Sequence, residues 1–191
     1  GFNNIFGREA AHKLTTGQYN NIMGYQAGQD GTTGSNNNIF GEKAGQRSTT
    51  GSNNNIIGKS ACGIGNMTGD GFNNIVGNYT AYYLTSGRYN NIIGAEAGYK
   101  LTTGEHNNIL GRWGGYNTTT GEGSIFLGDS AGYYNVTGDN NIAIGNNSGV
   151  PENSGDKSNT ICIGNGATVT DSSMCRIGDD DIKVGIGTSS P

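Results

Sequence analysis

A glycine that closes a short motif recurs along almost the whole chain, and no other feature limits the possible folds as strongly. The motif first reads NNIFG at residues 3–7, and the closing glycines are Gly7, Gly24, Gly41, Gly58, Gly77, Gly94, Gly111, Gly128, Gly145 and Gly164. Successive glycines are 17 residues apart, except for two intervals of 19. A fixed period over this many units predicts stacked repeats that bury apolar faces against their neighbours.

The length of the repeat selects the kind of stack. Two helices and their turns need more than ~30 residues, so a unit of 17 fits one coil of a β-solenoid. Hydrophobic residues make up only 32% of the chain and glycine contributes 36 of 191 residues, which indicates a thin core. TTG triplets supply a turn in five of the units. We expect an all-β solenoid of about ten coils, roughly 50 Å long at a strand spacing of ~4.8 Å.

The repeat also predicts the domain organisation. Residues 1–164 form the repeat solenoid, and residues 165–191 form an irregular C-terminal cap or a connector to a downstream domain beyond the chain. The two units of 19 residues should bulge outward, because a solenoid accommodates extra residues only at a loop. For the first of them, this places residues 64–68 outside the coil.

Two apolar columns precede the closing glycine. The residue directly before it is always large and apolar, and the one before that is mostly isoleucine. Side chains alternate between the two faces of a strand, so one column fits inside the coil and the other would lie in water. A stripe of that size is rare on a soluble monomer, which favours a parallel homotrimer around a long axis. We expect its interface to be the isoleucine column Ile22, Ile39, Ile56, Ile75, Ile92 and Ile109.

A polar column stands one residue further back. It is asparagine in seven units and isoleucine in the last three: Asn4, Asn21, Asn38, Asn55, Asn74, Asn91, Asn108, Ile125, Ile142 and Ile161. Stacked asparagines can hydrogen-bond along the axis as a ladder. We interpret this column as scaffold, with ligand binding as the alternative.

Aromatic residues form the one surface feature that repetition alone does not demand. The fifth residue after the glycine is tyrosine in four consecutive units, and a tryptophan lies nearby: Tyr82, Tyr99, Tyr116, Tyr133 and Trp113. These side chains combine apolar area with a polar group and could stack on sugar rings, which makes them the candidate ligand-binding residues. The alternative is that the tyrosines pack over one another at a corner or between subunits.

Several functions lack a basis in the sequence. The formal net charge of −4 and the scattered Lys and Arg residues give no electrostatic footprint for nucleic acid, and no apolar run approaches the ~18 residues of a membrane span. The carboxylates form no privileged pair, and His12 and His106 lie many coils apart. The acidic run GDDD at 178–181 is interpreted as a solvated turn. We therefore expect no catalytic site, no metal site and no cofactor.

A resemblance to known fibres gives these features a context. The segments DNNIAIGNNSG (139–149) and NTICIGNGATV (159–169) resemble head-domain repeats of trimeric autotransporter adhesins, which are left-handed β-rolls. The form TTGxxNNIxGxxAG resembles repeats of viral and phage tail fibres, and VGIGTSSP (184–191) resembles the segment that often precedes their trimerising chaperone-type domain. The resemblance implies an extracellular homotrimer, on a virion or cell surface, that attaches to a host glycan or receptor. A structural filament or spacer, an ice-binding solenoid and a polysaccharide depolymerase are the alternatives.

Overall fold

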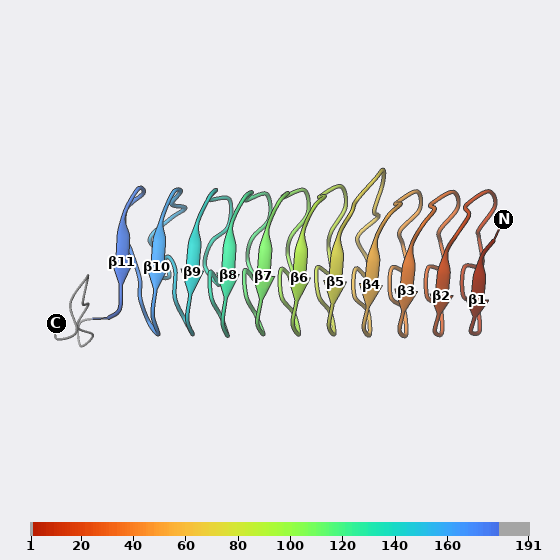
Figure 1. Cartoon of the computed structure of the whole chain (residues 1–191), viewed down its shortest axis with the longest axis horizontal. Coiled ribbons are helices and arrows are strands. Elements are labelled where there is room, and N and C mark those ends of the chain that lie inside the picture. The colour runs from red at the N-terminus through yellow and green to blue at the C-terminus, as the bar shows by residue number, and fades with distance from the viewer. Residues whose placement is uncertain (1, 180–191) are drawn as a thin grey trace, which may run out of the picture.

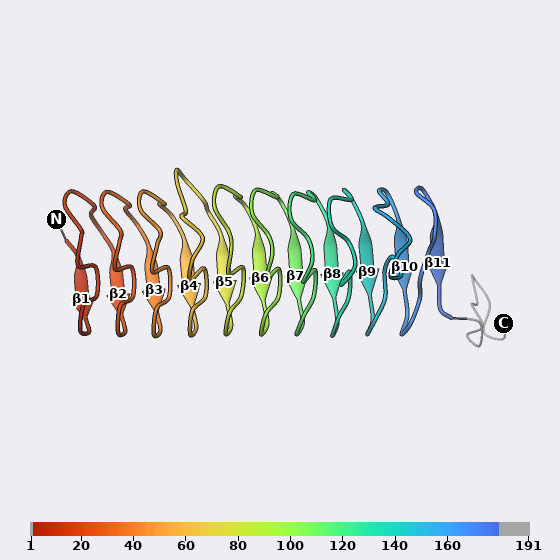
Figure 2. The same cartoon turned by 180° about the vertical axis from the view of Figure 1, so that it is seen from behind.

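A single row of coils runs the length of the molecule, and each coil passes once through the same parallel sheet (Figure 1). This computed structural model describes residues 2–179. The strands have three residues each: β1 Asn4–Phe6, β2 Asn21–Met23, β3 Asn38–Phe40, β4 Asn55–Ile57, β5 Asn74–Val76, β6 Asn91–Ile93, β7 Asn108–Leu110, β8 Ile125–Leu127, β9 Ile142–Ile144, β10 Ile161–Ile163 and β11 Cys175–Ile177. Seen from behind, the row is equally continuous (Figure 2). The expected all-β solenoid is confirmed.

The sheet keeps the repeat in register. Strands pair in chain order from β1 to β11, and equivalent residues face one another, as Ile22 faces Ile39 and Asn21 faces Asn38. The sheet does not end at residue 164, because β11 adds a further strand beside β10. The solenoid therefore continues past the boundary predicted at residue 164. Residues 184–191 and the last two residues of the acidic run, 180 and 181, lie outside the described part of the chain.

Between residues 2 and 179 the chain forms no helix, and thus none that is long and apolar enough to cross a membrane.

The isoleucine column faces the interior of the coil, so its expected role as a trimer interface is wrong. Its side chains are 0–5% exposed within a single chain: Ile22, Ile39, Ile56, Ile75, Ile92 and Ile109. Small residues across the coil, such as Ala27 and Ala97, are fully buried with them, and Leu84 and Leu101 fill further positions of the same core. The other apolar column points outward, and Phe6 and Leu110 are 74% and 49% exposed.

The two adjacent asparagines of each motif form two different ladders. The expected ladder exists in the second column, where the Asn21 Nδ2 donates to Asn38 Oδ1 at 2.9 Å, but it lies on the outward face. The first asparagine is the buried one. Asn90 is 1% exposed, and its Nδ2 donates to Asn73 Oδ1 at 3.1 Å and to the Gly104 carbonyl at 2.9 Å. This inner ladder satisfies polar groups that burial would otherwise leave without partners.

The two longer units leave the coil as loops, though not with every residue. The first protrudes between β4 and β5 in Figure 1, but Met67 within it is only 2% exposed. The expectation that residues 64–68 all lie outside the coil is therefore wrong at Met67, because its apolar side chain fills the core. The second loop, residues 151–159, contains no fully buried residue. Asp156 holds it, since its carboxylate accepts hydrogen bonds from the backbone and hydroxyl of Thr137 at 2.9 and 2.7 Å.

Candidate binding site

The tyrosine column forms a continuous stack of rings along the rod. Ring centroids of Tyr82 and Tyr99, Tyr99 and Tyr116, and Tyr116 and Tyr133 are 5.3, 5.0 and 5.3 Å apart, and the rings are within 11° of parallel. On the far side of Tyr82, a Cβ added at Gly63 would lie 2.6 Å from the ring, so this end of the stack rests on backbone. We call these four residues the tyrosine ladder.

Rings inside the ladder have little surface left for a ligand. Tyr99 and Tyr116 carry a tyrosine on each face. Burial and the neighbouring phenols raise the pKa of Tyr99 to about 12, and burial followed by the charge of Glu96 raises the pKa of Tyr116. These residues expose ring edges, so the packing interpretation applies to them.

The ladder ends at Tyr133 because the next coil has no tyrosine. Val150 occupies the equivalent position and is 6% exposed. Beside the ladder, the second position after the glycine also becomes small. In an earlier coil this position is Tyr79, which contacts Tyr82 edge-on. In the coils next to the end of the ladder the same position is Ser130 and then Asn147. Shorter side chains on both sides leave space at this point of the rod.

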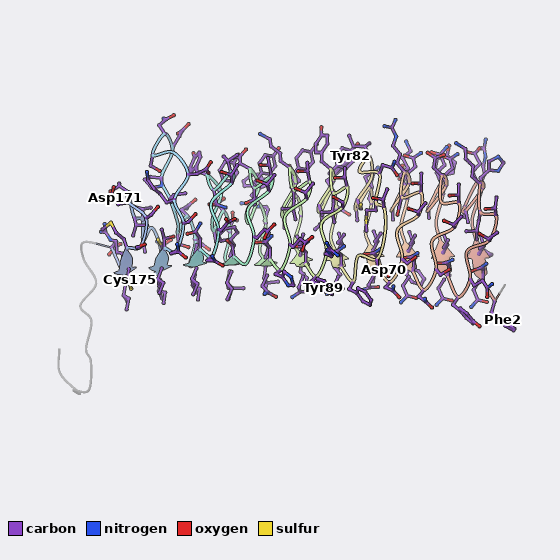
Figure 3. The ribbon with its side chains drawn as sticks, turned by 90° about the horizontal axis from the view of Figure 1, so that it is seen from above. Phe2, Asp70, Tyr82, Tyr89, Asp171 and Cys175 are labelled. Atoms are coloured by element: carbon purple, nitrogen blue, oxygen red, sulfur yellow. The ribbon has the colours of Figure 1, made fainter. Side chains whose placement is uncertain are left out.

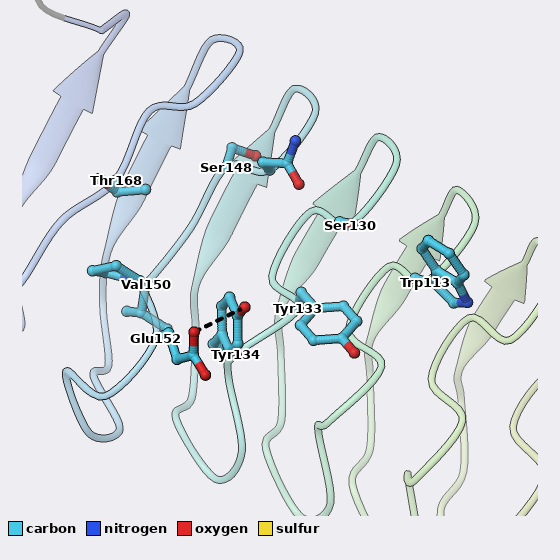
Figure 4. A pocket seen from close by; sticks show the side chains of 10 residues that line it. Trp113, Ser130, Tyr133, Tyr134, Ser148, Val150, Glu152 and Thr168 are labelled. Carbon is cyan, nitrogen blue, oxygen red and sulfur yellow. Dashed lines mark hydrogen bonds between the residues drawn. The ribbon is translucent and has the colours of Figure 1, made fainter.

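This space is a cavity of about 390 Å³, shown in Figure 4. Its lining combines aromatic, hydroxyl, amide and carboxylate groups from four consecutive coils: Trp113, Ser130, Tyr133, Tyr134, Asn147, Ser148, Val150, Pro151, Glu152 and Thr168. We call it the end cavity. A concave site with apolar rings and a few convergent polar groups is the form that small-molecule sites usually take.

The second loop closes one side of the end cavity. Tyr134 packs edge-on against Tyr133, with centroids 4.9 Å apart and rings at 75°. Its hydroxyl donates to Glu152 Oε2 at 3.4 Å, the contact drawn in Figure 4. The Glu152 carboxylate raises the pKa of Tyr134, because a nearby negative charge disfavours the phenolate.

The end cavity carries negative rather than positive charge. Glu152 is the charged residue in its lining, which includes no Lys or Arg. Arg112 stacks on Trp113 with its guanidinium 4.1 Å from the ring centroid, but it is paired with Asp129 at 2.8 Å. Hydroxyl groups supply further polar contacts. The Ser148 hydroxyl, for example, donates to the Gly145 carbonyl at 2.8 Å and keeps acceptor capacity.

Of the five aromatic residues expected from the sequence to bind a ligand, two line the end cavity. Trp113 and Tyr133 line the end cavity, while Tyr82, Tyr99 and Tyr116 do not. Sequence reasoning missed Tyr134 and Glu152. Their signal was the interruption of the tyrosine column where a longer unit begins.

A second, shorter aromatic stack was also missed. Phe72 and Tyr89 have ring centroids 5.5 Å apart, and Tyr89 and His106 are 5.0 Å apart. Figure 3 shows Tyr89 on the side of the rod opposite Tyr82. Aromatic rings therefore lie on two opposite sides of the rod, and the end cavity lies beside the tyrosine ladder.

Other hollows are larger but chemically simpler. One of about 460 Å³ is open to solvent beside Lys13, Asp30 and Arg47, and one of about 430 Å³ lies along the outward face of the first strands. Neither combines aromatic rings with a carboxylate. Residues 2–179 contain no group of three His, Cys, Asp or Glu side chains that could hold a metal ion.

Neither a family model, nor a curated protein, nor a solved structure matches this chain.

Proposed function

We propose that the chain is a non-enzymatic attachment element of an extracellular fibre, on a virion or a cell surface, that binds a host glycan or receptor. The end cavity carries this proposal. Trp113, Tyr133 and Tyr134 offer ring surface beside the carboxylate of Glu152 and the amide of Asn147. Sugars have apolar faces and polar edges, so this combination suits them. The function requires no cofactor.

The proposed form is a parallel homotrimer of left-handed β-rolls, joined by the outward apolar column rather than by the inward isoleucines. That column is partly or largely exposed in every strand: Phe6, Met23, Phe40, Ile57, Val76, Ile93, Leu110, Leu127, Ile144, Ile163 and Ile177. A second copy has the same period of ~4.8 Å, so its coils match this column one by one.

The area of the face supports more than two chains. Ten steps between strands of ~4.8 Å, with strands about 10 Å long, give a face of roughly 480 Å². Stable interfaces bury about 800 Å² per partner. The face alone is therefore smaller than a usual interface, and in the proposed trimer each chain would also bury surface on both sides of the face against its two neighbours.

A purely structural filament or spacer is the second candidate, and one observation favours it. In the tyrosine ladder, both ring faces of Tyr99 and of Tyr116 are covered by tyrosines of the same chain. Such a stack stiffens a rod without any ligand. The two functions differ at the end cavity, which a spacer does not need.

A glycan array and a panel of host cells separate the two candidates. We expect the folded chain to bind a defined subset of glycans, with three copies converting weak contacts into avidity. A folded, β-rich protein that binds neither glycans nor cells would instead be a spacer.

Mass in solution tests the assembly separately. We expect light scattering to give three times the chain mass, and the double variant Leu110→Asp, Ile163→Asp to give the mass of one chain. The double variant Thr103→Asp, Thr120→Asp, which adds two charges at exposed turn positions outside the strands, is the matched control and should remain a trimer. A wild-type monomer would contradict the proposed assembly.

A further inference from the structure

The interior of the tyrosine ladder shows what is missing at its end. Tyr83 stands edge-on beside two successive rungs, 5.2 Å from Tyr82 and 5.4 Å from Tyr99, with interplanar angles of 89° and 84°. Tyr134 occupies the same repeat position beside Tyr133, and the two flanking tyrosines are 40% and 41% exposed. Tyr134 therefore lies beside Tyr133, the last ring of the ladder, and beside the next position of the column, where the chain has Val150 instead of a fifth tyrosine.

We propose that the end cavity binds one neutral pyranose unit of a glycan, which takes the place of the absent fifth rung. Its ring stacks on the face of Tyr133 that no tyrosine covers, and Tyr134 contacts its edge as Tyr83 contacts Tyr99. The inference rests on the proposed attachment function and names the site and the ligand class.

A pyranose matches the lining group by group. Its C–H face packs on an aromatic ring, and its hydroxyls point outward around the edge. Glu152 accepts hydrogen bonds from hydroxyls, while Asn147 and Ser148 lie on other sides of the cavity with amide and hydroxyl groups. A volume of about 390 Å³ is at the small end of the usual range for ligand sites, ~300–1,000 Å³, which suits a single ring rather than a long oligosaccharide.

The charge of the lining excludes acidic sugars. A uronate, sialate or sulfated ring would place its anion near Glu152, and no cation in the lining compensates. Arg112 does not serve, because Asp129 already neutralises it. Like charges in a partly enclosed site repel, so the bound ring should be uncharged.

The single tryptophan of the chain makes the site directly observable, because Trp113 lines the end cavity. The probes are the methyl glycosides of glucose, galactose, mannose and N-acetylglucosamine, titrated into the full chain while tryptophan fluorescence is recorded. We expect a saturable change for at least one of them at millimolar concentration, which is ordinary for a single weak contact, and none for methyl glucuronide. A response to tetramethylammonium but to no pyranoside would overturn the proposal, since aromatic rings and a carboxylate also bind cations.

Matched variants locate the binding. We expect Tyr134→Ser to weaken the fluorescence-detected affinity about tenfold, because it removes an aromatic contact, and Tyr83→Ser, its counterpart inside the ladder, to leave it within about twofold. Glu152→Gln keeps the shape and should admit methyl glucuronide.

Two outcomes separate the inference from the function on which it rests. In the first, the chain binds glycans on the array, but Tyr83→Ser and Tyr134→Ser weaken this binding equally, or the bound glycan leaves Trp113 fluorescence unchanged. This outcome would contradict binding in the end cavity and leave the attachment function standing. A wild-type chain that binds no glycan on the array and no glycoside in solution would overturn both.

Discussion

The coils of β2 to β7 and those of β8 to β10 are built on one repeat but keep it to different degrees. In the first group, each core strand position holds isoleucine, and each inner asparagine from Asn20 to Asn107 donates its amide to the asparagine of the preceding coil. In the second group, the core position changes from Phe126 to Ala143 to Cys162, the outward asparagine becomes isoleucine, and the tyrosine ladder stops before Val150.

This difference shows how a solenoid gains a site. Where a repeat position keeps one residue type, each asparagine amide or tyrosine ring contacts its own copy one coil away, so its partners come from within the chain. Where the repeat is interrupted, a rung has no successor and a loop of extra residues stands beside the gap. The end cavity lies at this interruption, between Tyr133 and Glu152.

Breaking the strict repeat at its inner ladder should have the largest effect. Asn90→Ala removes the side-chain donor to the Gly104 carbonyl and the acceptor of the Asn107 backbone N–H, both in the interior. Asn73 Oδ1 keeps the backbone N–H of residue 90, and Asn107 Nδ2 keeps the Gly121 carbonyl. Unpaired buried groups cost about 1–3 kcal/mol each, so we expect a loss of roughly 3 kcal/mol or more in the free energy of unfolding. Urea unfolding measures it.

The neighbouring Asn91 provides the control. Its side chain is exposed on the outward face, so Asn91→Ala should change stability by less than about 0.5 kcal/mol. Equal losses for the two variants would mean that the inner ladder does not stabilise the coil more than the outer one.

A second comparison uses one repeat position in both groups of coils. A Cβ added at Gly132 would lie 2.5 Å from the Phe126 ring, whereas one at Gly98 would lie 3.4 Å from Ile92. Ala81 already holds this position in another coil, with φ of 48°. Both substitutions carry the cost of a left-handed side chain, about 1–2 kcal/mol. We expect Gly132→Ala to cost about 1–3 kcal/mol more than Gly98→Ala through overpacking. Thermal unfolding compares them, and similar losses would show that Phe126 adapts.

The stacked rungs should also make the rod sensitive to alkali. The pKa of Tyr99 is raised to about 12 in the fold, against ~10 for an unfolded tyrosine. The fold favours the neutral phenol, so this stabilisation is complete below pH ~10 and is lost as the pH rises through about 12. Tyr99→Phe should reduce that alkaline loss in a pH series of unfolding curves. An unchanged pH profile would show that the ring ionises as freely in the fold as in the unfolded chain.

The smallest effect should appear at the end cavity itself. Because the Glu152 carboxylate raises the pKa of Tyr134, Glu152→Gln should bring that pKa back toward ~10 with almost no change in stability. A spectrophotometric phenol titration, compared with Tyr134→Phe to assign the signal, measures the shift. If the pKa of Tyr134 were the same in Glu152→Gln as in the wild type, the Glu152 carboxylate would not lie close to the Tyr134 hydroxyl.

The period of the repeat was sufficient to predict the strands and their register, but not which apolar column is inside. Both columns are large and apolar, so alternation alone treats them as equivalent. The distinguishing signal was uniformity: Ile22, Ile39 and Ile56 keep one shape because the core imposes it, while the outward column varies freely. Likewise, the buried column stays polar, as Ser124, Asn141 and Thr160, where the outward column has become isoleucine.

The candidate site was only partly predictable for a related reason. A repeat analysis emphasises residues that recur, and it identified Tyr133 with its three copies. Tyr134, Val150 and Glu152 belong to no column of one residue type, and they meet only because the second loop returns beside the ladder. Side-chain geometry around an interruption follows from packing in three dimensions, which the period does not encode.

A crystal structure of the chain soaked with its best-binding neutral methyl glycoside tests most directly whether the interruption is the site. We expect one sugar ring per chain, stacked on Tyr133 at about the 5 Å spacing of the ladder and in contact with Tyr134. A sugar bound along the edges of Tyr99 and Tyr116, with the end cavity empty, would contradict that expectation.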